Sequence, residues 1–150
     1  MEELVTERMV IGGTRDHCLE ILTSFEHYPD WAADIKAVTI DERDDQGRAT
    51  KVTFRAAAFG RSTAYTLLYH YDDLPDELSW VQVAGDPTRR LDGAYSLVPS
   101  GGDATEITYQ LTVDLKVPLP GFVKRRAEGR IMGTALRELK ARVEGPQNDH

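Results

Sequence analysis

The chain has 150 residues, the length of one domain, and its 41% hydrophobic and 29% charged residues are proportions typical of a globular protein. No run approaches the ~18 consecutive apolar residues of a membrane span, and the acidic N-terminal segment lacks the apolar centre of a signal peptide. The net charge of −7 disfavours nucleic-acid binding, and a single cysteine excludes an internal disulfide. We therefore expect a cytoplasmic protein with one domain over 1–145 and a disordered tail at 146–150.

Residues 2–11 alternate in polarity as a strand does, and Gly12-Gly13 ends this strand with a turn. Thr14 is a favourable N-cap for a short helix over 15–24. Cys18 lies within this helix, where we expect it to pack in the core and not to act as a nucleophile.

The segment after this helix contains Pro29, which we expect to break the helix. Tyr28 and Trp31 flank the proline, and we expect them to form an aromatic joint between helix and sheet. Two short helices therefore separate the first strand from the second.

The rest of the chain up to residue 116 consists of alternating runs separated by five turn signals rich in Gly, Pro and Asp. The expected strands are 35–43, 48–59, 62–72, 77–84, 88–98 and 104–116. With the first strand they form a seven-stranded antiparallel sheet with one dry, concave face. The fold class is α+β, because a single long helix can cover that face.

Residues 120–144 have the apolar period of an amphipathic helix. Gly129 and Gly133 lie inside it, where each costs about 1 kcal/mol relative to alanine. Either the helix backbone approaches a strand closely there, or the missing side chains leave a void over the sheet. The segment also carries a net charge of +4, suited to an acidic carrier protein, an anionic membrane surface or plain solvation.

The inner face of the expected sheet combines small residues, such as Ala56, Ala58 and Gly93, with many aromatic ones. In strand 77–84 the alternation places Leu78, Trp80, Gln82 and Ala84 inside. A filled core would use more Ile and Leu, so we expect a partly hollow interior. The candidate ligand-binding residues are Phe54, Ala56, Tyr65, Leu67, Tyr69, Trp80, Gln82, Tyr95, Tyr109, Val113, Gly129, Met132, Gly133 and Leu136.

The order of these elements resembles the helix-grip architecture of the START-like (SRPBCC), birch-pollen-allergen superfamily. More narrowly, it resembles the polyketide cyclase/dehydrase and lipid-transport group, which includes coenzyme Q-binding proteins. The segments that carry the resemblance are FEHYPDW at 25–31, RRLDGAYSL at 89–97 and the whole of 115–144. The resemblance implies an elongated apolar cavity between sheet and C-terminal helix, with its mouth near the helix start and the loops around Phe59 and Gly85.

No catalytic motif stands out in the sequence. The four histidines lack metal-ligand spacing, and no nucleophile or phosphate-loop pattern occurs, so we assign no catalytic residue, metal or cofactor. The cyclases of the resembling group act without a cofactor, which leaves roles for the inner tyrosines and Gln82 in orienting carbonyl groups. Arg90 or Arg125 could polarise an enolate, although Arg90 alternates onto the wet face.

Three functions are compatible with the sequence. The preferred one is binding or transport of a hydrophobic small molecule: a lipid, an isoprenoid or quinone, or a polyketide. The alternative is a polyketide cyclase/aromatase or dehydrase that uses acid/base chemistry in the same cavity. A third is an interaction protein without a ligand, which large side chains filling the whole gap between sheet and helix would favour.

Overall fold

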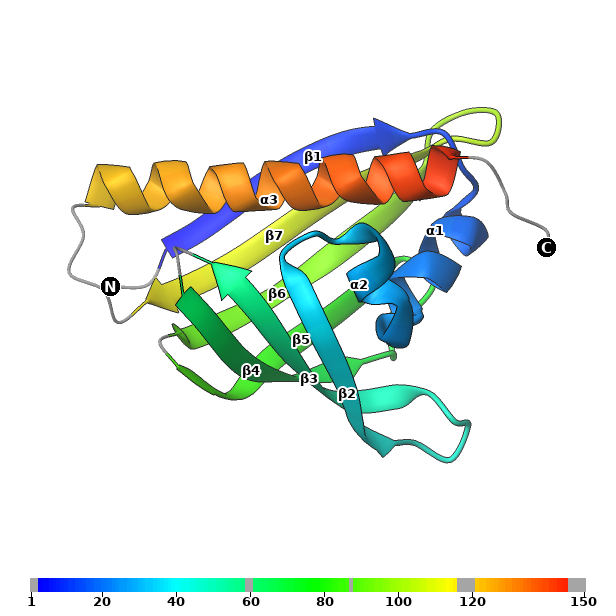
Figure 1. The fold of residues 1–150 in the computed structure, drawn as a ribbon. Helices are drawn as coiled ribbons and strands as arrows, with labels where there is room; N and C mark the ends of the chain where they lie inside the picture. The colour runs from blue at the N-terminus through cyan, green and yellow to red at the C-terminus, as the bar shows by residue number, and fades with distance from the viewer. Residues whose placement is uncertain (1–2, 59–60, 87, 116–120, 146–150) are drawn as a thin grey trace.

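The computed structural model describes residues 3–58, 61–86, 88–115 and 121–145 (Figure 1). The chain begins with a strand and three short helical segments, and it ends with a long helix. The elements are β1 (Glu3–Ile11), α1 (Arg15–Thr23), η1 (Phe25–His27), α2 (Tyr28–Trp31), β2 (Ile35–Arg43), β3 (Ala49–Ala58), β4 (Arg61–His70), β5 (Glu77–Asp86), β6 (Thr88–Pro99), β7 (Thr105–Leu115) and α3 (Gly121–Glu144). The expected strands and long helix are confirmed to within two residues at each end.

The strands form one antiparallel sheet in the order β1-β7-β6-β5-β4-β3-β2. From β2 to β7 every strand pairs with its neighbour in the chain, whereas β1 crosses over to pair with β7, so β1 and β2 are the two edges. Figure 1 shows the sheet curving beneath α3, which runs along β1, while α1 and α2 lie near the C-terminal end of α3. The predicted helix-grip architecture is confirmed.

The core forms between the inward-facing side chains of the strands and the apolar side chains on one face of α3. On β3, Val52 and Phe54 point inward and are buried. On α3, buried residues recur at steps of three and four, which makes one apolar stripe along the helix. The members of this stripe are Met132, Leu136, Leu139 and Val143, none more than 3% exposed. Sheet and helix therefore bury complementary faces.

The C-terminal half of α3 is fastened to both ends of the α1–α2 segment. The Gly12 N–H donates to Glu144 Oε2 at 2.6 Å, and the Ala33 N–H donates to Glu138 Oε2 at 3.0 Å. A Cβ on Gly13 would overlap Cγ1 of Val143. The glycine pair is thus a turn, as predicted, and also the place where the end of α3 packs against the chain.

The predicted helix break at Pro29 is wrong. Helix α1 already ends at Thr23, and Pro29 lies in the first turn of α2, where its missing N–H needs no partner. The aromatic joint is confirmed, because the ring of Tyr28 lies 4.9 Å from that of Trp31 and 5.7 Å from that of Phe54.

The predicted inward position of Ala84 is also wrong. Thr66 pairs with Ala84 but Leu67 pairs with Gln82, so Val83 is an extra residue that shifts the alternation of β5. Ala84 is exposed and pairs with Thr66, and Gly85, which is also exposed, pairs with Tyr65.

The expected packing of Cys18 is confirmed, because its side chain is buried and burial raises the pKa of the thiol. Within the described residues, no helix is both long and apolar enough to cross a membrane. The predicted disordered tail at 146–150 lies outside the described residues.

Candidate functional site

The concave face of the sheet brings together most of the residues predicted to bind a ligand. Phe54, Ala56, Leu67, Tyr69, Trp80 and Val113 come from β3, β4, β5 and β7, and each is at most 6% exposed. Helix α3 adds Met132 and Leu136, which are also buried. The apolar part of the predicted site is therefore continuous from the sheet to the helix.

Aromatic rings extend across this face from β3 to β7. The ring of Tyr65 stacks on Phe54 at 5.5 Å, and that of Tyr69 lies 5.7 Å from Trp80. Trp80 continues the series, with Tyr95 at 5.2 Å, and Tyr95 lies 4.6 Å from Tyr109. Each polar edge in such a band needs a hydrogen-bond partner from the protein or from a ligand.

Five tyrosine hydroxyls of the concave face and its border interact electrostatically with one another, those of Tyr28, Tyr65, Tyr69, Tyr95 and Tyr109, and Tyr28 interacts with Tyr71 as well. Burial raises the pKa of every one of them, because the interior disfavours a phenolate, and it brings the pKa of Tyr65 to about 12. Tyr109 donates a hydrogen bond to Tyr95, which lowers the pKa of Tyr95, but the larger effect of burial still raises it. All five are neutral hydroxyls at physiological pH.

Several of these tyrosines retain accessible surface although protein surrounds them. Tyr65, Tyr95 and Tyr109 are partly exposed, and yet burial dominates the pKa of each. Within the described residues, the Tyr69 hydroxyl has no hydrogen-bond partner, whereas the Tyr28 hydroxyl donates to the Leu22 carbonyl at 2.6 Å. These partly exposed rings are the part of the predicted site that a ligand could contact, and the expected hollow interior stays a prediction.

One part of the expected hollow is filled. Gly93 lies between Trp80 on β5 and Leu111 on β7, and the indole of Trp80 packs against it. A Cβ on Gly93 would lie 2.8 Å from Cζ2 of that ring. The indole N–H donates to the Leu91 carbonyl at 2.9 Å. The absence of a side chain at Gly93 therefore makes room for the indole of Trp80, and the indole fills the space that a void would occupy.

Gly133 supports neither of the two interpretations offered for the helix glycines. The space where a Cβ of Gly133 would lie contains the guanidinium of Arg137 at 3.2 Å and Oε1 of Glu7 at 4.0 Å. Polar side chains, and not a strand backbone or an apolar void, are thus its nearest neighbours. Gly129 lies in α3, and its surroundings are outside the described part of the structure.

Gln82 on β5 and Arg90 on β6, two of the polar residues considered for catalysis, both contact Asp92. Gln82 is partly exposed, and its backbone N–H donates to Asp92 Oδ1 at 2.8 Å. Arg90 is exposed and its Nε donates to Asp92 Oδ2 at 2.6 Å, in agreement with its predicted place on the wet face. The side chain of Arg125 and the predicted mouth at Phe59 lie outside the described residues, which contain no cluster suited to a metal ion.

Sequence reasoning missed two residues that belong to this site. Tyr28 was expected only as a joint, yet its hydroxyl faces the tyrosine cluster. The charge of Asp34 contributes to the raised pKa of Tyr65, which places this carboxylate near the end of the cluster. The aromatic content of the HYPDW motif was the available signal for Tyr28, whereas the position of Asp34 depends on the fold.

Comparison with known proteins assigns a family to this arrangement. Residues 13–140 match the family model described as polyketide cyclase/dehydrase and lipid transport. No curated protein sequence gives a comparable match.

Solved structures agree over nearly the whole chain. A START superfamily protein from Mycobacterium smegmatis has a TM-score of 0.89 and 25% identity, over 94% of this chain and 97% of that one. The Zhui aromatase/cyclase from Streptomyces sp. R1128 has a TM-score of 0.82 and 13% identity, over 96% and 94%. Major latex-like protein 151 from Panax ginseng has a TM-score of 0.71 and 13% identity, over 95% and 98%. The last two likenesses show the fold alone.

Proposed function

The chain belongs to the polyketide cyclase/dehydrase and lipid transport family, and from this membership we propose that it binds a hydrophobic small molecule between the sheet and α3. The ligand is a lipid, an isoprenoid or quinone, or a polyketide. The observation that carries the proposal is the cluster of enclosed tyrosines that keep accessible surface within an otherwise apolar interior. The candidate lining residues are those assembled on the concave face and on the buried stripe of α3.

The apolar walls supply affinity and the hydroxyls supply orientation. Burial of about 200 Å² of apolar ligand surface contributes roughly 5 kcal/mol. A hydrogen bond from a tyrosine to a ligand oxygen adds only about 1 kcal/mol, but it selects ligands that carry a carbonyl or hydroxyl group. Because burial raises the pKa of Tyr65 and Tyr69, both remain donors at neutral pH.

A cyclase or dehydrase is the second candidate, and the same tyrosine cluster supports it. Neutral phenols that face a bound polyketide could donate hydrogen bonds to a developing enolate. The raised pKa values of Tyr95 and Tyr109 disfavour the phenolate form, so these residues suit the acid role and not the base role. Wild-type cyclisation rates in Tyr95→Phe and Tyr109→Phe variants would remove these roles.

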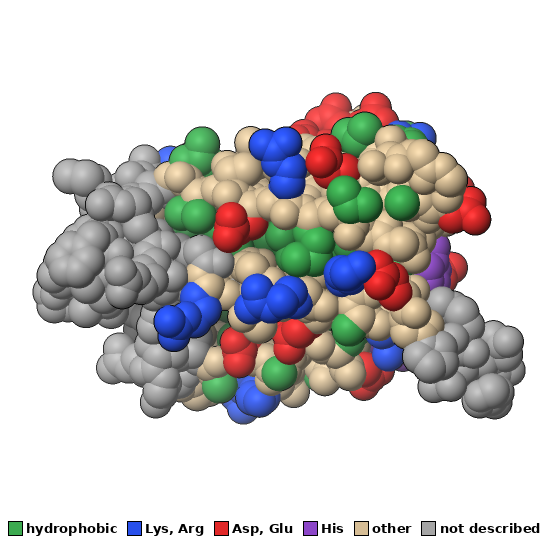
Figure 2. Space-filling view, turned by 90° about the horizontal axis from the view of Figure 1, so that it is seen from above, with side chains coloured by type: hydrophobic (Ala, Val, Ile, Leu, Met, Phe, Trp, Pro, Cys, Tyr) green, Lys and Arg blue, Asp and Glu red, His purple; other side chains and the backbone are tan. Residues whose placement is uncertain are grey.

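The described part of α3 gives limited support to a macromolecular partner. Lys140 pairs with Glu144, and Arg130 and Arg137 are exposed. Figure 2, which looks onto this side of the molecule, shows Lys and Arg side chains next to Asp and Glu side chains, without a uniformly basic surface. Docking of an acidic carrier protein or an anionic membrane stays a prediction, and the ligand is the partner that we propose.

The test uses the fluorescence of Trp80, because the chain has only two tryptophans and a Trp31→Phe variant leaves Trp80 as the reporter. Titration with a fatty acid, a short-chain quinone and an anthraquinone should give a saturable change for at least one of them. Native mass spectrometry of the purified protein should detect a retained ligand of the same class.

The tyrosine hydroxyls are tested by a double Tyr65→Phe, Tyr69→Phe variant. Loss of two hydrogen bonds should weaken binding of an oxygen-bearing ligand about 30-fold. The control is Tyr71→Phe, which removes a hydroxyl that already donates to the Ala49 carbonyl, so ligand binding should not change. The proposal fails if no ligand class changes Trp80 emission saturably and no compound accompanies the protein in the mass spectrometer.

A further inference from the structure

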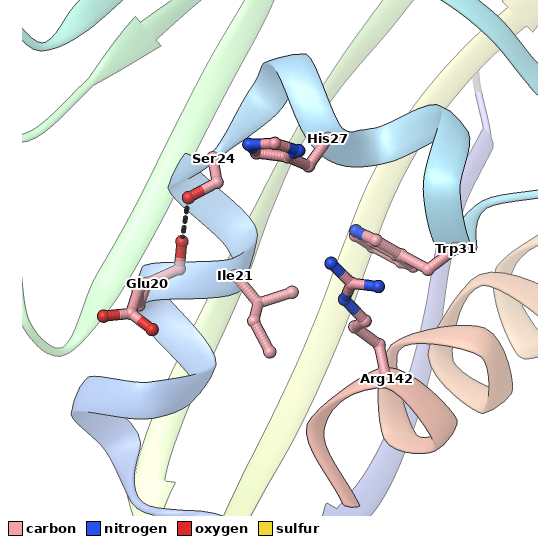
Figure 3. Close-up of a pocket in the computed structure, with 6 residues that line it drawn as sticks. All are labelled: Glu20, Ile21, Ser24, His27, Trp31 and Arg142. Atoms are coloured by element: carbon pink, nitrogen blue, oxygen red, sulfur yellow. Dashed lines mark hydrogen bonds between the residues drawn. The ribbon is translucent and has the colours of Figure 1, made fainter. Parts of the chain in front are cut away.

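A second, smaller space lies outside the tyrosine interior. It is a pocket of about 130 Å³ between α1, the η1–α2 segment and the last turn of α3 (Figure 3). The side chains that line it are Glu20, Ile21, Ser24, His27, Trp31 and Arg142. The ring of Trp31 contacts Tyr28, whose hydroxyl belongs to the interior cluster, so these two rings stand between the pocket and the interior.

The indole N–H of Trp31 is an unused donor at this pocket. Its nitrogen is buried and has no hydrogen-bond acceptor among the described residues. The other indole, that of Trp80, donates to a backbone carbonyl at 2.9 Å. A buried donor without an acceptor is costly and therefore uncommon. Figure 3 shows the Trp31 nitrogen and the guanidinium of Arg142 close to one another beside the same space.

Arg142 is a cation for which the described residues offer no counter-ion at this place. Its side chain is exposed, and it pairs with no acid among them, whereas Lys140 on the same helix pairs with Glu144. The acid in the lining is Glu20, whose side chain is 76% exposed and lies 3.8 Å from Nδ1 of His17. Figure 3 shows that carboxylate turned away from the pocket.

The remaining lining residues define the shape of a ligand. Ser24 Oγ donates to the Glu20 carbonyl at 2.7 Å, and His27 Nδ1 lies 3.2 Å from Asp30 Oδ2, so both already have partners. Ile21 and the indole of Trp31 offer apolar walls. The free polar groups are thus donors, one of them charged, beside a small apolar surface.

We propose that this pocket binds a small organic carboxylate with a compact apolar body. The planar guanidinium of Arg142 matches a carboxylate, and the Trp31 N–H gains an acceptor from the same group. A cavity of about 150 Å³ holds a benzene molecule, so in this pocket of about 130 Å³ the apolar body of the ligand is no larger than a benzene ring, with its carboxylate at Arg142. Trp31 Nε1 has almost no accessible surface, so a carboxylate can reach it only if a side chain of the lining moves, and the exposed Arg142 side chain, which has no partner among the described residues, can make that movement while keeping its charge on the carboxylate.

The two indole N–H resonances in a ¹⁵N-labelled sample provide the test, after assignment with Trp31→Phe and Trp80→Phe variants. Titration with benzoate should shift the Trp31 indole resonance saturably and leave that of Trp80 in place. Arg142→Gln should weaken this binding at least tenfold. Arg130→Gln is the matched control, because it removes another exposed arginine of α3 about three turns away, and it should bind as the parent does.

Three outcomes would overturn the proposal. The first is the absence of a saturable Trp31 shift, and the second is equal affinity in Arg142→Gln and Arg130→Gln. The third is binding of inorganic phosphate or neutral benzyl alcohol as tightly as benzoate, which would remove the need for an apolar body or for a charge. Since interior binding is read from Trp80, failure of this site and failure of the proposed function are distinguishable.

Discussion

A methyl group added at Gly93 tests the packing that positions Trp80, the ring at the centre of the interior aromatic band. The new Cβ would lie 2.5 Å from the Gln110 carbonyl oxygen, 2.8 Å from Trp80 Cζ2 and 3.0 Å from Leu111 Cδ1. Strand β7 is paired on both sides, by β1 and β6, so its backbone cannot retreat. The indole must move by roughly 0.7 Å to restore ordinary carbon–carbon contact.

The expected loss of stability is the sum of two destabilising contributions and one stabilising contribution. Overpacking of a filled core costs about 1–3 kcal/mol, and weakening of the Trp80 hydrogen bond to Leu91 adds about 1 kcal/mol. Alanine is favoured over glycine in a strand by about 0.5–1 kcal/mol. The steric contribution is the largest, so Gly93→Ala should lower the free energy of unfolding by about 1–3 kcal/mol.

Urea unfolding followed by tryptophan emission and circular dichroism measures this loss. A double-mutant cycle with Trp80→Phe separates the ring from the strand, because the smaller ring leaves room for the methyl group. The two changes should couple by about 1 kcal/mol. The proposed packing of Trp80 against Gly93 would be refuted if the Gly93→Ala protein were as stable as the parent. It would also be refuted if the effects of Gly93→Ala and Trp80→Phe on the free energy of unfolding were strictly additive.

Three further predictions concern the turn, the interior and the cysteine. Gly13→Ala should destabilise the protein by about 1–3 kcal/mol in urea unfolding, because the methyl group overlaps Val143, and Val143→Ala should recover part of the loss. Burial raises the pKa of Tyr65 to about 12 from its ordinary value of 10, so the folded state keeps a proton that the unfolded chain loses. Its contribution to stability should be constant below pH 10 and fall by about 1.4 kcal/mol per pH unit from pH 10 to 12, and Tyr65→Phe should lessen that slope. Cys18 should react with a thiol reagent far more slowly in the folded protein than in urea, because burial excludes the reagent and raises the thiol pKa; comparable rates would contradict this.

The strands were predictable because the signals that define each one, alternating polarity and turn residues at its ends, lie within its own stretch of sequence. Alternation along 104–116 separates Ile107, Leu111 and Val113, which are buried, from Thr108 and Gln110, which are not. Turn residues mark the ends of every strand, and these signals need no knowledge of the partner strand. The seven strands and the helix that covers them therefore followed from local patterns.

The details that failed depend on contacts between distant segments. The extra residue Val83 in β5 is defined only by its pairing with β4. Whether Gly93 faces a void or a ring depends on where β5 places Trp80. The pocket at Trp31 joins helices more than a hundred residues apart in the chain, so no spacing in the sequence brings Arg142 to it.

Hydrogen bonding divides the interior polar groups into two kinds. Tyr28 and Trp80 donate to the carbonyls of Leu22 and Leu91, so a ligand would have to break a protein hydrogen bond to use either of them. The hydroxyls of Tyr65 and Tyr69 have no such bond among the described residues. Water or a ligand must satisfy them, and only a ligand also covers the surrounding apolar surface. Tyr65 and Tyr69 both lie on β4, so under the proposed function we expect the oxygen-bearing end of a ligand to lie toward that strand.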